Sequence, residues 1–335
     1  MTEPQVLRHV IESITPASAA HGDGARRSVA SANAPLLERL AVQLGGAQHT
    51  ARPRSARRTI VVCAGDHGAG DPGISLGAAH PTVIAAHAIA DGDAALAHVA
   101  RSSRAPIVLV DAGTRESQAM PSSAVRLGRG LDTGLGHGAS RDLMDGPAMT
   151  AQDAALALEA GIALAVSLAD GGLDVLAIGA IGVGADVASA ALLGAALGAP
   201  PTGLGDPVAE AAGAKGAAYH RPAFHRAGAL ALLAAFGGPE TGVLAGLLLA
   251  AAATHVPVIL DGYATGAAAL VAAAFAPEVT GYLIAAHAGA FTHARMLAHL
   301  GLHPIFDVGL GHGEGTGAAM VLPLIDQVTA LASRG

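Results

Sequence analysis

Along the chain, short runs rich in branched apolar residues alternate with longer alanine-rich segments. Runs of four or five such residues are typical of buried strands, and the segments between them have the length of helices. The runs span residues 59–63, 107–110, 175–178, 256–260, 282–284 and 305–308. This alternation predicts an α/β fold: an open, mostly parallel, Rossmann-like sheet with helices on both faces.

The ends of the chain follow a different pattern. Within residues 1–57, leucines at 36, 37, 40 and 44 have helical spacing and no strand-like run appears. We therefore expect residues 1–57 to form a helical appendage that packs with the C-terminal helices as a small subdomain, and residues 58–335 to form the α/β core. Two stretches rich in Gly, Pro, Ser and charge, 112–142 and 198–222, are expected to be long loops.

Polar residues and glycines gather directly after the predicted strands. Asp66 and His67 follow the first run, Asp111 the second, Asp261 the fourth and His287 the fifth. Because open α/β sheets bind ligands at the carboxyl ends of their strands, this arrangement predicts a ligand site at that edge of the sheet.

Composition and charge exclude several classes of protein. Apolar residues make up 52% of the chain and aromatic residues only 2%, so Ala, Leu, Val and Ile must build the core. A net charge of −7 argues against a nucleic-acid partner, which would require a clustered basic surface. The short basic cluster of Arg52, Arg54, Arg57 and Arg58 is interpreted as a solvated linker.

Cysteine usage and hydropathy bear on the compartment. Cys63 is the only cysteine, which rules out an intramolecular disulfide and fits a reducing environment. The N-terminus lacks a basic region followed by an apolar stretch, so no signal peptide is expected. The most apolar stretch, 242–260, is interrupted by His255 and Pro257 and indicates a buried helix followed by a strand. We expect a cytoplasmic protein that does not enter a membrane.

Glu314 is the strongest candidate for chemistry. It lies between Gly313 and Gly315, and no other carboxylate occurs between Asp307 and Asp326. Flanking glycines allow a ligand to approach the backbone closely, and a carboxylate presented there is a candidate general base. The alternative is a glycine-rich turn whose glutamate only interacts with the dipole of the following helix.

Ordered motifs along nearly the whole chain resemble the nicotinate-nucleotide–dimethylbenzimidazole phosphoribosyltransferase family. The motifs include Val-Val-Cys-Ala-Gly-Asp-His-Gly at 61–68, Phe-Gly-Gly-Pro-Glu at 236–240, Pro-Val-Ile-Leu-Asp-Gly at 257–262 and Gly-Glu-Gly-Thr-Gly-Ala-Ala at 313–319. The resemblance implies transfer of phosphoribose from nicotinate mononucleotide to a ring nitrogen of 5,6-dimethylbenzimidazole, which yields an α-riboside 5′-phosphate and nicotinate.

The resemblance also implies roles for individual residues. Glu314 falls on the family's base position, and the enzyme needs neither metal nor cofactor and acts as a homodimer. A base with a pKa near the working pH suits this proton transfer, and burial raises the pKa of a carboxyl group. The residues expected to bind the substrates are Asp66, His67, Ser75, Thr82, Val83, Gly182, Gly184, Lys215, Asp261, His287, Gly313, Gly315 and Thr316.

The chain departs from the family pattern around both substrates. Near the nucleotide, Ala180, Ala185, Asp186 and Val187 replace one carboxylate and three polar residues, and Gly311 replaces an arginine. The usual lysine has only a displaced counterpart, Lys215. Phosphate is therefore expected to be held largely by backbone N–H groups of the glycine run.

The residues expected beside the acceptor base differ as well. Val83 stands where a glutamine is usual, and the segment 288–293 lacks a serine and a glutamate. An apolar pocket separates close analogues by only about 1–3 kcal/mol. We therefore expect relaxed acceptor choice, which Val83→Gln is predicted to sharpen.

Other interpretations of these residues remain open. Asp66 and His67 could orient each other and a ribose or could cap a helix. Asp261 could hold a ribose hydroxyl, take part in the dimer contact, or bond to its own turn. The whole chain could be a paralogue that binds a nucleotide without turnover. A metal-dependent hydrolase using Asp66, His67 and His287 is a third hypothesis.

Overall fold

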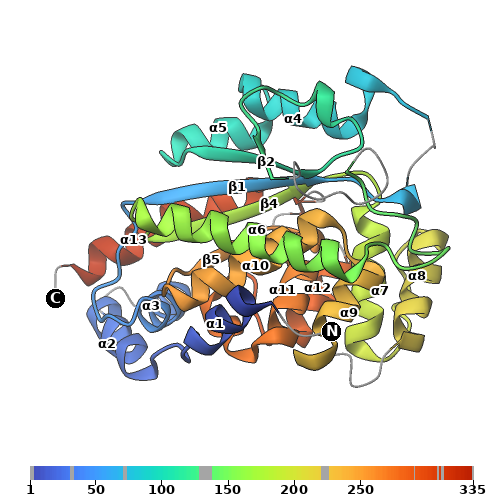
Figure 1. Ribbon diagram of the computed structural model, residues 1–335. Coiled ribbons are helices and arrows are strands. Elements are labelled where there is room, and N and C mark those ends of the chain that lie inside the picture. Colours follow the sequence, from blue (N-terminus) through green and yellow to red (C-terminus); the bar gives the residue numbers. More distant parts are fainter. Residues whose placement is uncertain are drawn as a thin grey trace.

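A sheet of six parallel strands forms the centre of the computed structural model (Figure 1). The structure describes residues 4–30, 34–70, 74–127, 138–219, 226–289, 291–307, 309–310 and 313–333. The strands are β1 (Arg58–Gly65), β2 (Ile107–Gly113), β3 (Val125–Arg126), β4 (Val175–Ile181), β5 (Val258–Leu260) and β6 (Leu283–Ala285). Their order is β3-β2-β1-β4-β5-β6. This is the usual order of a doubly wound sheet, and the predicted fold class is confirmed.

One strand prediction was wrong, and one strand was not predicted. The run 305–308 does not form a strand: Phe306 makes an isolated bridge with His287, and residue 308 lies outside the described residues. The amides of Ile305 and Phe306 donate to carbonyls at the end of β6, so pairing stops after one step. In contrast, β3 was not predicted, because two exposed residues give no periodic signal.

Each face of the sheet has its own apolar core, because side chains alternate along the strands. In β1, Val61 and Cys63 belong to one core, and Ile60 and Val62 belong to the other. The first core is covered by α1 (Gln5–Ser13), α6 (Ala151–Asp170), α7 (Ala185–Leu197), α8 (Pro207–Tyr219), α9 (Arg226–Phe236), α10 (Pro239–Ala253), α11 (Tyr263–Phe275) and α12 (Phe291–His299). The second is covered by α2 (Ala19–Val29), α3 (Pro35–Ala47), α4 (Pro81–Asp91), α5 (Ala95–Ser102) and α13 (Thr316–Ala332).

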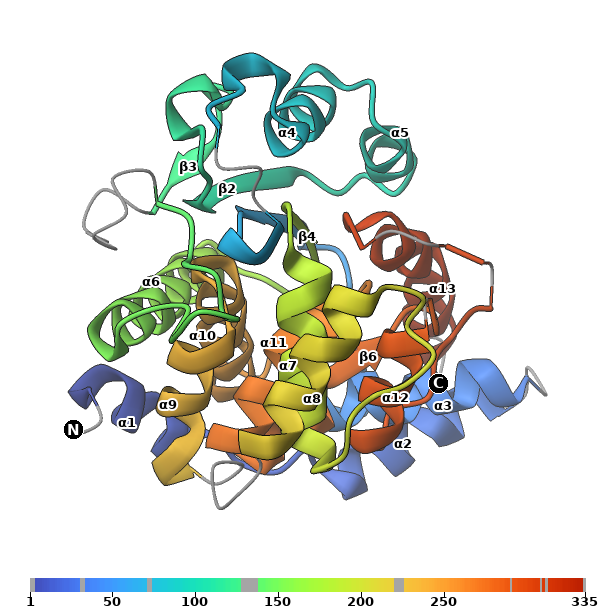
Figure 2. The ribbon, with the colours of Figure 1, turned by 90° about the vertical axis from the view of Figure 1, so that its right-hand side faces the viewer.

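The abundance of alanine and glycine lets the helices pack closely. Where α6 meets α10, a β-carbon on Gly161 would lie 1.9 Å from the carbonyl oxygen of Val243, and one on Gly246 would lie 2.0 Å from that of Leu158. The α7–α8 pair at the front of Figure 2 is similarly close. Backbone contact of this kind replaces the large aromatic side chains that the chain lacks.

The N-terminal helices divide between the two faces. Helices α2 and α3 pack on each other and on α13, whereas α1 packs on α6 and α10. The boundary at residue 57 stays a prediction. The stretch 198–222 was wrongly predicted to be a loop, because α8 occupies Pro207–Tyr219. Its alanines and the proline at its first position favour a helix.

Two helical stretches are long and apolar enough, by length and composition, to cross a membrane: Pro81–Ser102 and Ala151–Asp170. The first is divided into α4 and α5 at Gly92, which has a left-handed backbone (φ 91°). The second packs on α10 within the fold. Both stretches are thus helices of the folded domain that are only partly buried, and the absence of a membrane partner stays a prediction.

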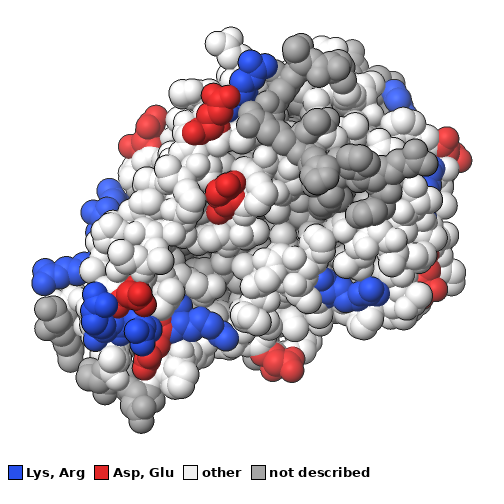
Figure 3. Space-filling view, turned by 90° about the horizontal axis from the view of Figure 1, so that it is seen from below, with Lys and Arg blue, Asp and Glu red and all other residues white. Residues whose placement is uncertain are grey.

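The face of the molecule seen in Figure 3 is mostly uncharged. Basic side chains gather with acidic ones at the lower left of this view, and the others are scattered, so no broad basic surface forms on it. Nucleic-acid binding would require such a clustered basic surface, and this face does not provide it.

Candidate active site

The sheet reverses its order of strand addition at the boundary between β1 and β4. The chain adds β2 and β3 on one side of β1, and then adds β4, β5 and β6 on the other. At such a switch point the connections leave in opposite directions and open a crevice beyond the carboxyl ends of the strands. A cavity of about 280 Å³ lies there. It is lined by Pro81, Thr82, Ala85, Ala180, Ile181, Gly182, Val183, Tyr263, Gly313 and Glu314.

Glu314 is half-buried in this cavity, and its carboxylate makes no hydrogen bond or ion pair with another described residue. Its backbone lies directly on β4. The amide of Ala180 donates to the carbonyl oxygen of Gly313 at 2.9 Å. A β-carbon on Gly179 would lie 2.3 Å from the carbonyl carbon of Glu314. Only a glycine at 179 leaves room for this approach, so β4 and the turn together fix the position of the carboxylate.

Asp261 anchors the same turn from the end of β5. Its carboxylate is fully buried and accepts hydrogen bonds from the amides of Gly315 at 2.6 Å and Ala318 at 2.8 Å. The ring of His287 donates from Nε2 to Asp261 Oδ1 at 3.2 Å. Backbone amides at the start of a helix have no acceptor within that helix. The Asp261 carboxylate is the acceptor for two such amides at the start of α13. This carboxylate holds the Glu314 turn, a role that the sequence interpretations did not include, and a contact with a ribose or at a dimer interface stays a prediction.

Asp66 connects two walls of the cavity with the segment that follows β2. Its carboxylate accepts from the hydroxyl of Thr82 at 2.5 Å and from the amides of Val183 and Arg115, each at 2.9 Å. Asp66 itself follows β1, Val183 follows β4 and Arg115 follows β2. Thr82 lies at the start of α4. Asp66 therefore fixes the positions of Thr82 and of the glycine run relative to each other.

His67 forms a buried pair with Glu240, at the start of α10. The ring donates from Nε2 to Glu240 Oε1 at 2.9 Å, and its Nδ1 lies 3.3 Å from the hydroxyl of Ser140. Burial lowers the pKa of His67, but the nearby Glu240 carboxylate outweighs burial and raises it above its ordinary value. For Glu240, burial raises the pKa, and the charge and hydrogen bond of His67 outweigh this and lower it. Both shifts favour the ionised form of the pair, which connects the end of β1 with α10.

Tyr263 is a site residue that the sequence did not reveal. It begins α11, lines the cavity together with Glu314, and its hydroxyl makes no hydrogen bond with another described residue. Burial and the charge of Asp186 raise its pKa, so the hydroxyl is a neutral donor. Since the Thr82 hydroxyl is already donated to Asp66, Tyr263 is the lining side chain with a free O–H among those described.

Comparison with known proteins identifies the chain. A family model described as "Phosphoribosyltransferase" matches residues 14–334. The nicotinate-nucleotide–dimethylbenzimidazole phosphoribosyltransferase of Desulforudis audaxviator is 36% identical over 340 residues, which cover 97% of this chain and 94% of the relative. The protein of the same name from Roseiflexus sp. (strain RS-1) is 38% identical over 302 residues, which cover 86% of this chain and 82% of that relative. The crystal structure of the enzyme of that name from Thermus thermophilus superimposes with a TM-score of 0.76 at 28% identity, covering 99% of this chain and 96% of that one.

The chain belongs to the nicotinate-nucleotide–dimethylbenzimidazole phosphoribosyltransferase family. The resemblance inferred from the sequence motifs is thereby confirmed.

Of the residues expected to bind the substrates, three line the cavity: Thr82, Gly182 and Gly313. The predicted base, Glu314, lines it with them. Gly315 and Thr316 continue directly from the base turn into α13, and Gly184 precedes α7 with a left-handed backbone (φ 78°). The roles of these residues toward substrates stay predictions.

Three other residues lie elsewhere. Val83 is fully buried in the core on the α4 side of the sheet, so its side chain does not line the cavity. Lys215, on α8, donates to the carbonyl oxygens of Leu143 and Met144 at 2.5 and 2.9 Å. Ser75 is exposed and donates to Glu116 at 2.6 Å. Sequence motifs place a residue near a site but do not show which way its side chain points.

The replaced residues can now be located as well. Ala180 lines the cavity, and Ala185 and Val187 are buried at the start of α7, whereas Asp186 beside them is exposed. Gly311 lies outside the described residues.

The arrangement does not support the hydrolase hypothesis. Asp66 accepts hydrogen bonds from Thr82 and backbone amides. His67 pairs with Glu240, and His287 pairs with Asp261. Their polar atoms are thus directed toward separate neighbours and do not converge on one metal ion. Among the described residues, no group of three or more His, Cys, Asp or Glu residues is placed to hold a metal.

Proposed function

We propose that this chain transfers phosphoribose from nicotinate mononucleotide to 5,6-dimethylbenzimidazole or a similar aromatic base. The products would be an α-riboside 5′-phosphate and nicotinate, as in synthesis of the lower ligand of cobalamin. The observation that carries the proposal is the carboxylate of Glu314, which has no hydrogen-bond or ion-pair partner among the described residues. It lies in a small, mostly apolar cavity at the switch point of the sheet, in a chain that belongs to this family.

In this reaction the protein has to activate mainly the nucleophile, because the leaving group needs little assistance. Nicotinate leaves as the electrons of the bond to C1′ neutralise its pyridinium nitrogen, so the leaving group needs no acid. One nitrogen of the azole forms the new bond to C1′, and the other nitrogen loses its proton to Glu314. A half-buried carboxylate that has no competing partner in the described part of the chain is suited to accept it. Attack on the face opposite nicotinate inverts C1′, so the main task of the protein is positioning.

The lining of the cavity suits a flat aromatic acceptor. Pro81, Ala85, Ala180, Ile181 and Val183 supply apolar contacts. Tyr263 supplies a free O–H, which we assign to the acceptor base or the ribose. We place the phosphate at the glycine run 182–184 and the start of α7, where helix amides lack internal partners.

The proposal extends to the assembly and its location. We propose a homodimer that works in the cytoplasm without metal or cofactor. The dimer and the absence of a cofactor are what the resemblance of the sequence motifs implies, and the lone, buried Cys63 is compatible with a reducing compartment.

The proposal is tested by incubating the protein with nicotinate mononucleotide and a panel of azoles and phenols, with mass spectrometry of new ribosides. We expect nicotinate release together with an α-riboside phosphate. The Glu314→Gln variant should retain nucleotide binding by calorimetry and lose roughly two to four powers of ten in turnover. Nucleotide binding without nicotinate release in the parent protein would instead favour a non-catalytic paralogue.

A further inference from the structure

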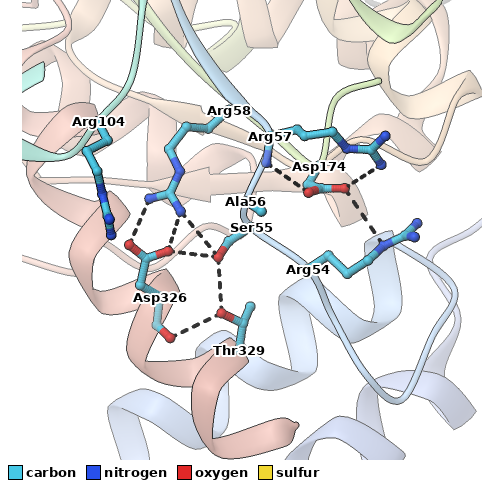
Figure 4. Close-up of a pocket in the computed structure, with 9 residues that line it drawn as sticks. All are labelled: Arg54, Ser55, Ala56, Arg57, Arg58, Arg104, Asp174, Asp326 and Thr329. Atoms are coloured by element: carbon cyan, nitrogen blue, oxygen red, sulfur yellow. Dashed lines mark hydrogen bonds and ion pairs between the residues drawn. The ribbon is translucent and has the colours of Figure 1, made fainter. Parts of the chain in front are cut away.

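A second cleft, of about 800 Å³, opens at the opposite edge of the sheet (Figure 4). It lies at the amino ends of the strands: Arg57 and Arg58 lead into β1, Asp174 precedes β4, and Arg104 precedes β2. Asp326, on α13, completes it. The cleft is therefore separated from the Glu314 cavity by the length of the strands, and nothing in the proposed reaction uses it.

One side of the cleft is a cluster around Asp174. Its Oδ2 accepts from the amide of Arg57 at 2.9 Å and its Oδ1 from Arg57 Nη2 at 3.0 Å. Arg54 approaches Oδ1 only through Nε, at 3.8 Å. Burial raises the pKa of Asp174, but the hydrogen bonds and charge of Arg57 outweigh it and lower the pKa, so the carboxylate is charged. Two arginines thus share one aspartate.

The other side is a cluster around Asp326. Arg58 donates to both oxygens of its carboxylate, and the hydroxyl of Ser55 donates to Oδ1 at 2.8 Å. Burial raises the pKa of Asp326, and the pairing with Arg58 and Ser55 outweighs it and lowers the pKa. The side chain of Arg104 points toward the same carboxylate but makes no hydrogen bond or ion pair with another described residue. Here too, two arginines share one aspartate.

The cleft therefore carries a positive charge on a negatively charged protein. Its lining holds four arginines and two aspartates, a net charge of +2, whereas the whole chain carries −7. The free donors face outward, since the side chains of Arg54 and Arg57 are 73% and 53% exposed and Arg104 is exposed as well. Arg58 is only 7% exposed, which corrects its assignment to a solvated linker.

We propose that this cleft binds an elongated small anion with negative charge at both ends, of the oligophosphate class. Figure 4 shows the two clusters on either side of Ser55 and Ala56, so one compact anion would face only one of them. An oligophosphate chain can place one terminal group at each cluster. Planar guanidinium groups bind phosphate oxygens in pairs, and Arg54, Arg57 and Arg104 each have N–H groups without a partner among the described residues.

The test is calorimetric titration of the full chain with tripolyphosphate, orthophosphate and succinate. We expect tripolyphosphate to bind at least tenfold more tightly than orthophosphate, because only the longer anion reaches both clusters. Binding should persist when nicotinate mononucleotide is saturating, since that ligand would occupy the opposite edge of the sheet. Equal affinity for tripolyphosphate and orthophosphate, or displacement by nicotinate mononucleotide, would overturn the proposal whether or not the chain is an active transferase.

Two variants assign the binding to the cleft. Arg54→Gln and Arg104→Gln remove exposed side chains that make no hydrogen bond to other described residues, so both should fold. Each should weaken tripolyphosphate binding by roughly threefold to tenfold. Arg52→Gln is the matched control, because Arg52 is exposed in the same segment but does not line the cleft. A loss of affinity in Arg52→Gln equal to that in the other two would show nonspecific attraction and overturn the assignment.

Discussion

The backbone of Glu314 crosses β4 at Gly179, so closely that a β-carbon on Gly179 would lie 2.4 Å from the carbonyl oxygen of Glu314. The position of the proposed base is therefore fixed by a residue that takes no part in the chemistry. This relationship makes the strand a support for the base turn, and it can be tested without altering Glu314 itself.

Gly179→Ala should push the base turn away from the cavity. Overpacking of this kind costs about 1–3 kcal/mol of stability. A displacement of the base by about 1 Å should lower turnover about a hundredfold. Thermal unfolding and initial rates of nicotinate release check both effects. The control is Gly146→Ala, since a β-carbon there would contact nothing within 4 Å. Full activity in Gly179→Ala would mean that the position of the turn is not critical.

Asp261→Asn should loosen the same turn from the other side. An amide nitrogen cannot accept a hydrogen bond, so the N–H of Gly315 or Ala318 loses its partner at a cost of about 1–3 kcal/mol. We expect a lower melting temperature and a lower kcat, measured by calorimetry and by steady-state kinetics. Asp170→Asn, at an exposed position, should change neither. If Asp261 instead bound substrate, KM would rise while stability stayed unchanged.

Tyr263→Phe removes the free hydroxyl of the cavity without changing its shape. Loss of one hydrogen bond to a substrate costs about 1.5 kcal/mol, which corresponds to roughly a tenfold fall in kcat/KM. Tyr219→Phe, at an exposed position on α8, is the control. Rates with a series of benzimidazoles would show whether the hydroxyl contacts the acceptor. An unchanged kcat/KM for every acceptor would exclude a role for Tyr263.

The buried pair of His67 and Glu240 should make stability depend on pH in a defined way. The raised pKa of His67 means that its contribution is complete below about 6.5, its ordinary value, and is lost as the pH rises through the folded-state pKa. The lowered pKa of Glu240 means that its contribution is present above about 4.5 and is lost as the pH falls through the folded-state pKa.

Urea unfolding of the parent and of Glu240→Gln, measured from about pH 4 to pH 9, tests this dependence. The variant should be less stable by about 1–3 kcal/mol near pH 6, because buried His67 loses the carboxylate that accepts its hydrogen bond and keeps the ring protonated. The difference should shrink toward both ends of the range. Glu278→Gln, at an exposed position, should follow the parent. A difference that is constant over this range would mean that the pair is not ionised.

Much of the site could be predicted from the sequence because its elements are local. Glycines around Glu314 and polar residues after each strand are visible as patterns, and parallel strands bring their carboxyl ends to one edge. Val83 shows the limit. It follows Thr82, which lines the cavity, yet α4 turns its side chain into the core. Val83→Gln would therefore bury an amide, instead of sharpening acceptor choice as the sequence suggested.

Partners far apart in the sequence could not be predicted from it. The pairs His67–Glu240 and Asp261–Gly315 join segments separated by 173 and 54 residues. A titratable residue after a strand indicates only that its side chain needs a hydrogen-bond or ion-pair partner. Several residues elsewhere in the sequence could be that partner equally well.

The amino-acid sequence by itself determined the alternation of strands and helices, the parallel sheet, the family and the position of the candidate base along the chain. These properties depend on hydrophobic periodicity and on motifs that span few residues. The tertiary structure alone decided which carboxylates hold the fold together, and that Glu314 lies in a cavity without a partner among the residues that the structure describes. It also placed six charged residues from four separate segments around the arginine-lined cleft. Hydrogen bonding and burial depend on distances in space, and only the packing of the two sheet faces sets those distances.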